Sequence, residues 1–437
     1  MIRPERLQGY YDRKRETAGR RARQRYQETW LRALVAHAWR RAPGFRRRLE
    51  AVSLRPADLR TPEALARLPV MKKSAMPDLQ RADPPFGGFC AVPRGDLHWV
   101  FVSPGPIYEP FARRDESPWH TEVACFAGGF RPGDVIVNTF LYHLTPAAHL
   151  IDRGLARVGC TVVPTGPGNA DVQLKTILDL GATGYVGTPS FLMTLLQHAE
   201  TKGVARLPLE VAQVGAEALP ASLRQTLEQR YGILTRQSFG TADLGIVAYE
   251  CREADGMHVL DDALLEICDP HTGAPLPAGN VGEIVCTVNH RTYPMIRFGT
   301  GDLSVLTEAP CPCGRTSARM LGWRGRADEV TKVRGMFIHP RQVEEVAARF
   351  PAVTRHQADS LRAAQRHSVA RRSRSGAESA ARRRRQPVGS RDRRARRAGR
   401  RAFRRAAGGD RPRRAGGNRL PRGVATRRVF ARLRDTA

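Results

Sequence analysis

Four residues with metal-binding side chains lie in two widely separated stretches of this 437-residue chain. Cys251 and His258 are seven positions apart, and Cys311 and Cys313 stand together in the segment CPCG. Three thiols and an imidazole are ligands that suit a tetrahedral zinc ion. The site exists only if the fold brings two loops together, and the alternative is a set of unligated thiols in loops. The remaining cysteines lie in apolar or isolated contexts that favour packing.

Glycine-containing loops follow several strand-like segments in the middle of the chain. Strands are expected at residues 134–140, 160–165, 182–189, 209–215 and 233–240, with helices at 172–180 and 190–200. This alternation predicts a parallel sheet covered by helices on both faces. Ligands bind beyond the carboxyl ends of such strands, so the loops VGAEAL, SFGTAD and GTPS are the candidates to hold one.

The segments before and after this region differ from it in their expected secondary structure. Residues 1–98 are expected to form a helix-rich flank, because apolar residues from Trp30 to Ala38 repeat at helical spacing. Residues 99–327 form the ligand-binding domain, and short strands with glycine turns indicate an antiparallel β subdomain from about Leu264. A small mobile domain is expected to start at residues 328–357, after which all periodicity stops.

The net charge of +30 is concentrated at the end of the chain. Residues 358–437 contain 27 Arg, no Lys and five acidic residues, a net charge of +22, which leaves +8 for the rest. We expect this tail to be disordered and to attract nucleic acid only non-specifically. No apolar run approaches the roughly 20 residues of a membrane-spanning helix, and the charged start has no secretory-signal core. A cytoplasmic protein without membrane contact is therefore expected.

Eight segments, in order, resemble the adenylate-forming acyl-CoA synthetases, and within them the phenylacetate–coenzyme A ligase family. They are LPVMKK, NTFLYHLTPAA, VGAEAL, SFGTADLG, GEIVCT, YPMIRFGTGD, CPCGRT and GRADEVTKVRG, and the match covers residues 10–357. The resemblance implies an α/β fold. It has a large adenylate-forming N-terminal domain with parallel sheets flanked by helices, an antiparallel β subdomain, and a small C-terminal domain that is incomplete here. Some relatives also look built to hold zinc at the cysteine and histidine positions.

The resemblance also implies a reaction and its substrates. A carboxylate, here an aromatic acid similar to phenylacetate, attacks the α-phosphate of ATP to give an acyl-adenylate, and coenzyme A then displaces AMP. ATP, Mg²⁺ and coenzyme A are the cofactors implied. Phe140 and Tyr142 fall where the family places aromatic residues near the acyl pocket, although ordinary core packing is an alternative for both.

The adenine contacts are carried over to two of the loops. Gly215, Ala216 and Glu217 would line the adenine slot, where small residues let the backbone approach the flat base. Phe239 and Gly240 match the family's aromatic-glycine pair, whose ring stacks on adenine. A glycine that merely turns the chain and a phenylalanine in the core are the alternatives.

Four further residues are assigned to the ribose, the metal ion and the hinge. Asp302 would accept hydrogen bonds from both ribose hydroxyls, since a carboxylate offers two acceptor oxygens and no competing donor. Arg326 would contact the same ribose, and Asp328 would be the hinge of the small domain. Asp243 stands where the family usually has a magnesium-binding glutamate, and its shorter side chain would shift the ion.

The phosphate loop departs from the family pattern, which is rich in Ser, Thr and Gly and ends in Gly-Lys-Pro. The matching segment here is SPGPIYEP, residues 103–110. Pro104 and Pro106 have no N–H to donate, and Glu109 carries a negative charge where the family has lysine. Repulsion of a phosphate about 5 Å away would cost roughly 1 to 3 kcal/mol. Either the loop serves a different partner or the protein is a decayed ligase.

The end of the sequence contains a second departure, because no lysine follows Lys332 where the family uses a catalytic one. An Arg, Ala, Gly, Pro and Ser tail without lysine is what a GC-rich coding region yields in a shifted frame, so a frameshift near Gln357 is one hypothesis and a genuine basic arm is another. Three functions stay open: a working ligase, an inactive nucleotide- or acyl-binding relative, and nucleic-acid binding through the tail. A homodimer is one assembly left open.

Overall fold

A computed structural model describes residues 3–113, 120–327, 331–333 and 336–338 of the chain. The chain divides into two units, residues 1–337 and 338–437. The predicted hinge Asp328 and the arginine-rich tail lie outside the described residues. No helix in the described ranges has the length and apolar character needed to cross a membrane.

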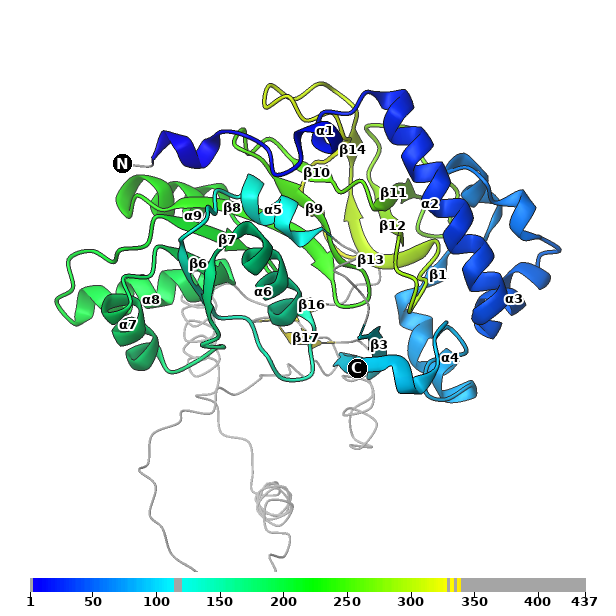
Figure 1. Ribbon diagram of the computed structural model, residues 1–437, viewed down its shortest axis with the longest axis horizontal. Helices are drawn as coiled ribbons and strands as arrows, with labels where there is room; N and C mark the ends of the chain where they lie inside the picture. Colours follow the sequence, from blue (N-terminus) through cyan, green and yellow to red (C-terminus); the bar gives the residue numbers. More distant parts are fainter. Residues whose placement is uncertain (1–2, 114–119, 328–330, 334–335, 339–437) are drawn as a thin grey trace, which may run out of the picture. The chain divides into compact units, whose positions relative to one another are not determined.

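The larger of the two main sheets in the described chain has nine strands in the order β14-β15-β10-β9-β8-β7-β6-β4-β5 (Figure 1). Its strands are β4 (Val135–Asn138), β5 (Thr161–Val163), β6 (Gly184–Gly187), β7 (Val211–Val214), β8 (Leu234–Thr241), β9 (Gly245–Glu250), β10 (Met257–Val259), β14 (Leu306–Thr307) and β15 (Arg319–Met320). Strands β5, β4, β6, β7 and β8 pair in parallel, which confirms the predicted parallel sheet. From β8 onward the pairing is antiparallel.

Helices cover both faces of the parallel strands. Helices α5 (Thr121–Ala127) and α6 (Ala147–Val158) pack on the face that carries Ile136 and Val186. Helices α7 (Ala170–Asp179) and α8 (Pro189–Thr201) pack on the face of Val137 and Tyr185. Because successive strand residues point to opposite faces, these two cores lie on opposite sides of the sheet. The local sequence fixes the start of α8, where Thr188 caps the helix and Pro189 occupies its first turn.

A second sheet has four strands in the order β1-β13-β12-β11 and corresponds to the predicted antiparallel subdomain. Its strands are β1 (Met71–Lys72), β11 (Ala263–Cys268), β12 (Gly282–Val288) and β13 (Phe298–Ser304). The long helix α2 (Arg20–Arg41) packs its apolar side, with Leu31 and Leu34, into a core shared with Leu264 and Phe298. Strand β1 joins this sheet by parallel pairing with β13. The N-terminal segment is therefore a structural part of the β subdomain.

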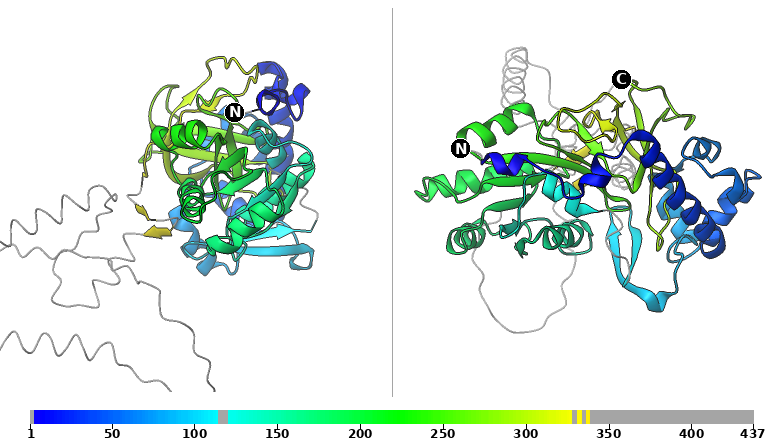
Figure 2. Two further views of the ribbon diagram at one scale, coloured as in Figure 1. Left: turned by 90° about the vertical axis from the view of Figure 1, so that its left-hand side faces the viewer. Right: turned by 45° about the horizontal axis from the view of Figure 1, so that its top comes forward.

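A hairpin and several short elements complete the described chain (Figure 2). Strands β2 (Leu97–Ser103) and β3 (Ile107–Ala112) pair in antiparallel fashion, and β16 (Thr331–Val333) and β17 (Met336–Ile338) form a separate two-stranded sheet. The helices and helical turns not yet named are η1 (Pro4–Leu7), α1 (Arg13–Glu16), α3 (Pro43–Glu50), η2 (Pro56–Asp58), η3 (Glu63–Arg67), η4 (Lys73–Ala75), α4 (Met76–Ala82), η5 (Arg94–Asp96), α9 (Ala221–Gln225) and η6 (Thr226–Arg230).

Ion pairs attach η1 and α1 to segments next to both main sheets, and of the paired side chains only that of Arg15 is partly exposed. Arg6 forms an ion pair with Asp134 at 2.8 Å, and Arg315 donates to Glu16 at 2.7 Å. Arg15 binds Asp262 at 2.6 Å. Since a buried charge without its partner is costly, these pairs specify where the segment docks.

The ion pair of Arg15 with Asp262 also involves His120, and this group of residues predicts a pH-dependent stability. Hydrogen bonds of His120 to Asp262, 3.1 Å away, and to Glu122, 2.9 Å away, raise its pKa to about 9, against the opposing charge of Arg15. A histidine with a raised folded-state pKa stabilises the fold fully below its unfolded value of about 6.5. The contribution is lost as the pH rises through about 9.

We therefore expect His120→Gln to lower the free energy of unfolding at pH 6 but to have little effect at pH 10. Urea titrations across this range measure the difference, with the exposed His271→Gln as the control. An equal loss at both pH values would show that the protonated imidazole does not contribute.

Candidate functional site

The predicted adenine loop follows the carboxyl end of β7. Ala216 has a left-handed backbone, with a φ of 63°, which a non-glycine residue rarely adopts outside a specialised turn. A Cβ atom on Gly215 would lie 3.3 Å from the carbonyl oxygen of Ser238 and 3.9 Å from the ring of Phe140. Glycine therefore lets the loop lie close to β8. The predicted adenine loop also lies beside Phe140, one of the predicted acyl-pocket residues.

Phe239 and Gly240 lie on β8, directly opposite β9. The Phe239 ring is half-buried and packs against two apolar cores, while a β-bulge separates it from Gly240. A Cβ atom on Gly240 would lie only 2.3 Å from the carbonyl oxygen of Gly245, so only glycine fits there. The bulge fixes the orientation of the ring at the end of the strand.

Asp302 lies on β13 and forms an ion pair with Arg326, the second residue assigned to the ribose. Arg326 Nη1 donates to Asp302 Oδ1 at 3.2 Å, and the Asp302 side chain is only 15% exposed. The indole N–H of Trp323 donates to the same oxygen at 2.9 Å. Trp323 is 47% exposed, which is unusual for so large an apolar side chain.

The sequence analysis did not identify Trp323 as part of the site. The signal available was a tryptophan three residues before Arg326 in the segment WRGRAD. The local sequence does not show that its N–H reaches Asp302, because Asp302 lies on β13 and Trp323 follows β15, with β14 between these strands in the chain.

A charged cluster, here called the Lys73 cluster, consists of the partly buried Lys73 and the buried Ser103, Glu109 and Asp243. The Lys73 ammonium forms an ion pair with Asp243 Oδ2. The Ser103 hydroxyl donates to Glu109 Oε1 at 2.6 Å. Glu109 is 1% exposed and Asp243 is 2% exposed. The four residues come from η4, from both strands of the β2-β3 hairpin and from the β8-β9 turn, so only the tertiary fold brings them together.

The electrostatic setting of this cluster differs from that of a surface ion pair. Burial, reinforced by the neighbouring Asp243, raises the pKa of Glu109 well above its usual value. Burial is the largest single influence on the pKa of Lys73 and lowers it, but the neighbouring carboxylates, chiefly Asp243 and then Glu109, together raise it. Asp302 adds to the same attraction. Lys73 is thus a permanently charged group between the predicted magnesium ligand and the predicted ribose ligand.

The segment that matches the phosphate loop forms the tip of the β2-β3 hairpin. Ser103 pairs with Ile107 across the turn. Gln80 receives a hydrogen bond from the Tyr108 amide at 2.8 Å and donates one to its carbonyl at 2.7 Å, and these bonds tie the hairpin to α4. The family's glycine-rich loop is replaced by a hydrogen-bonded turn. The Glu109 carboxyl group lies inside the Lys73 cluster.

The two predicted acyl-pocket aromatics have different surroundings. Phe140 packs against the core between α5, α6 and the sheet. The Tyr142 hydroxyl donates to Asp152 at 2.8 Å, and its ring contacts that of His149 edge-on, with centroids 5.3 Å apart. The His149 ring also lies 5.2 Å from that of Trp99. The structure therefore places Tyr142 in an aromatic group with the hairpin, apart from Phe140.

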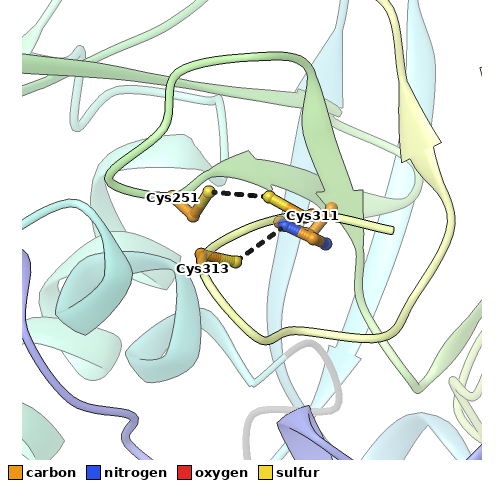
Figure 3. Close-up of side chains that lie close together, drawn as sticks. Cys251, Cys311 and Cys313 are labelled. Carbon is orange, nitrogen blue, oxygen red and sulfur yellow. Dashed lines mark hydrogen bonds between the residues drawn. The ribbon is translucent and has the colours of Figure 1, made fainter. Parts of the chain in front are cut away.

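The four predicted zinc ligands come together, and all four are buried (Figure 3). Cys251 follows β9, His258 lies on β10, and the two remaining cysteines lie in the loop between β14 and β15. The sulfur atoms of Cys251 and Cys311 are 3.8 Å apart, and Cys313 Sγ lies 3.4 Å from His258 Nε2. Two sulfurs bound tetrahedrally at about 2.3 Å from zinc would be separated by roughly 3.8 Å.

Hydrogen bonds around these residues favour metal binding. Contacts with Cys251 and His258 lower the pKa of Cys313 to about 2, which makes it a thiolate, the form that binds metal. His258 Nδ1 faces Ser317, 3.3 Å from its carbonyl oxygen, so that Nε2 points toward the sulfurs. Such an outer contact fixes the ring of a metal-binding histidine.

Comparison with known proteins identifies relatives of both the sequence and the structure. Residues 125–290 match the family described as AMP-binding enzyme. The chain is similar to the phenylacetate-coenzyme A ligase of Thermus thermophilus, with 34% identity over 354 residues and 78% of each chain covered. It is 30% identical to that of Escherichia coli, covering 78% of this chain and 79% of the other. A solved 2-hydroxyisobutyryl-CoA ligase, in complex with 2-HIB-AMP and CoA, superposes with a TM-score of 0.74 and 25% identity, covering 80% of this chain and 77% of that chain.

Proposed function

The chain belongs to the phenylacetate–coenzyme A ligase family of adenylate-forming enzymes, and from this membership we propose that it couples an aromatic carboxylic acid to coenzyme A. ATP would first convert the acid to an acyl-adenylate, and the coenzyme A thiol would then displace AMP. The observation that supports the proposal is that Asp302 and Arg326, which the family pattern assigns to the same ribose, lie in contact with each other. Phenylacetate-like acids are the proposed substrate class, because the named relatives act on phenylacetate.

Each part of the site has a proposed role in this reaction. The Gly215–Glu217 loop and Phe239 would hold adenine, and Asp302 with Arg326 would bind the ribose. Lys73 would stabilise negative charge that develops on the α-phosphate, because a fixed cation in a buried setting needs no reorganisation.

Asp243 is suited to hold the magnesium ion that the family implies. Its Oδ1 is buried without a hydrogen-bond partner within the described part of the chain, and a carboxylate oxygen is a ligand that Mg²⁺ prefers. When bound, the ion would neutralise phosphate charge. The Asp243 side chain is held in place by Lys73 on its other oxygen.

We further propose that ATP binds this chain less well than AMP does. The β2-β3 hairpin places Glu109, in contact with Ser103, where the family has a phosphate-binding lysine. A loop that contains Pro104 and Pro106 also offers fewer N–H donors to the triphosphate tail. The first half-reaction would therefore be slow.

The test is an assay of acyl-CoA and AMP formation from phenylacetate and related arylacetic acids with ATP, Mg²⁺ and coenzyme A. We expect slow formation of both products, and a larger rise in the melting temperature with AMP than with ATP. AMP binding without any acyl-CoA from the acids tested would instead indicate an inactive nucleotide-binding relative. Tight ATP binding would contradict the proposed effect of the hairpin.

We also propose a structural zinc ion at Cys251, His258, Cys311 and Cys313. Tyr10 donates to the carbonyl oxygen of Cys313 at 2.8 Å, so the loop that would hold the ion also anchors the N-terminal segment. A zinc ion would stabilise both the cysteine loop and its contact with the N-terminal segment, because a structural zinc site contributes directly to folding energy.

The zinc prediction is that the purified protein contains about one zinc ion per chain. Cys313→Ser should lose most of it and melt several degrees lower, measured by elemental analysis and thermal denaturation. Cys160→Ser is the matched control, since this half-buried thiol lies outside the group. Full zinc content in Cys313→Ser would rule out this ligand set.

A further inference from the structure

We infer that Asp152 is a positioning residue that holds the loop between β4 and α6 (residues 139–146, here called the β4-α6 loop) in the shape that an aromatic acid needs. The inference rests on the proposed function, because this loop carries Phe140 and Tyr142, the two predicted acyl-pocket residues. Asp152 itself lies on α6 and acts through Tyr142 and Asn138, without touching the acid.

The second half of the β4-α6 loop is exposed and irregular. The loop contains no helix or strand, and the side chains of Leu141 and Leu144 are 43% and 64% exposed. Leu144 has a left-handed backbone, with a φ of 65°. A segment with so few buried apolar contacts is held in place weakly by packing. The position of Tyr142, between the two leucines in the chain, therefore depends on its hydrogen bonds and ring contacts.

The Asp152 carboxylate connects Tyr142 to the end of β4. The Tyr142 hydroxyl donates to Asp152 Oδ2 at 2.8 Å and lies 3.0 Å from Oδ1. The side-chain amide of Asn138, the last residue of β4, donates to Asp152 Oδ1 at 2.7 Å. An ionised carboxylate accepts at both oxygens, as two donors require. One side chain thus ties the middle of the loop to the strand that precedes it.

Asn138 extends this connection to Phe140. The Asn138 side chain is fully buried, and its Oδ1 accepts from the Phe140 backbone N–H at 3.1 Å. Because Asp152 binds the nitrogen of the same amide, it also fixes which way the amide oxygen points. The Phe140 ring lies beside Gly215 in the predicted adenine loop. Asp152 therefore orients Tyr142 directly and Phe140 through Asn138.

Separate contacts hold the backbone of the loop. His149 Nε2 lies 3.1 Å from the carbonyl oxygen of Tyr142, and the Val102 N–H donates to the carbonyl oxygen of Leu144 at 2.6 Å. These contacts involve the loop backbone, whereas Asp152 binds the Tyr142 hydroxyl. Loss of the Asp152 carboxylate should thus release the Tyr142 side chain while the loop stays attached, so that acid binding weakens and nucleotide binding does not.

Calorimetric titration of the full-length protein with phenylacetate, at saturating AMP, tests the inference. We expect Asp152→Ala and Tyr142→Phe each to weaken phenylacetate binding about tenfold, while AMP binding measured alone stays within about threefold of the wild type. Asp152→Asn, which keeps one acceptor oxygen, should give an intermediate affinity. Tyr231→Phe is the matched control, because its hydroxyl donates to the carboxylate of Glu200 at 3.0 Å in an exposed hydrogen bond.

The double variant Asp152→Ala/Tyr142→Phe separates positioning from a general loss of stability. Removing the Tyr142 hydroxyl from Asp152→Ala should weaken phenylacetate binding by less than a further factor of about two, since its hydrogen bond is already lost. Circular dichroism checks the fold of each variant. In steady-state assays the KM for phenylacetate should rise, with the KM for ATP unchanged. Fully additive effects, or wild-type phenylacetate affinity in Asp152→Ala, would overturn the inference.

The outcomes also distinguish this inference from the proposed function. Acyl-CoA formation by the wild type, with unchanged phenylacetate binding in Asp152→Ala, would refute the inference alone. Phenylacetate binding that Asp152→Ala weakens, without acyl-CoA formation by the wild type, would refute the proposed function alone. A wild type that binds no phenylacetate would contradict both.

Discussion

Asp302→Ala should weaken AMP binding by at least about 100-fold, because a hydrogen bond to a charged group contributes about 1.5 to 3 kcal/mol and the ribose would lose two. The fold should be largely retained, since the Trp323 indole N–H is exposed and can be solvated, while the mostly buried Arg326 side chain would lose one hydrogen bond. Calorimetric titration with AMP measures the loss. Asp302→Asn, which keeps one acceptor oxygen, should give an intermediate affinity.

The fluorescence of Trp323 provides a second readout of the same prediction. Its indole N–H is bonded to the oxygen that a ribose hydroxyl would use, so AMP should change its emission. Trp323→Phe should abolish that change and leave the AMP affinity within a few-fold of the wild type. The control is Asp179→Ala, which removes an exposed carboxylate on α7. Wild-type AMP affinity in Asp302→Ala would show that the ribose binds elsewhere.

Arg297→Leu should be the most destabilising single substitution considered for this chain, with a loss of about 3 to 5 kcal/mol in the free energy of unfolding. The Arg297 side chain is 2% exposed and forms an ion pair with Glu266 at 3.1 Å. It also donates to the carbonyl oxygens of Leu68 at 2.6 Å and Gly273 at 2.7 Å. Leucine would leave the Glu266 charge and both carbonyl groups without this partner.

Urea denaturation compares Arg297→Leu with Arg291→Leu, an exposed arginine six residues earlier in the chain. The control should change the free energy of unfolding by no more than about 0.5 kcal/mol. Arg297→Lys should lie between the two, since lysine keeps the charge but cannot reach all the acceptors. A loss below about 1 kcal/mol in Arg297→Leu would mean that water replaces these contacts.

The parallel strands and the loops after them could be predicted from the sequence, because alternation of strands and helices is a local pattern. The segment at Gly215 follows β7 as expected, whereas Phe239 lies within β8, which extends to Thr241. The same local reasoning could not identify Lys73 as part of the site. Its position depends on β1 pairing with β13, which joins Met71 to Phe298, and no periodicity in the chain records a pairing over that distance.

Residue type alone was also insufficient for the charged and aromatic groups. The sequence shows Glu109 as a carboxylate in place of lysine, but not that it is buried beside Ser103. It shows Phe140 and Tyr142 two residues apart, but not that they face different neighbours. The four proposed zinc ligands could be named from their chemistry, whereas their coming together depends on β10 lying between β9 and β15.

The pairing of β1 with β13 gives Lys73 and Asp302 a common support. Both residues extend from the four-stranded sheet, whereas Gly215, Phe239 and Asp243 extend from the nine-stranded sheet. A nucleotide bound by residues of both sheets would link them, with its base held by the nine-stranded sheet and its ribose by the four-stranded sheet. Release of AMP would then remove contacts that connect the two sheets, so product release would lower the stability of the whole adenylate-forming unit.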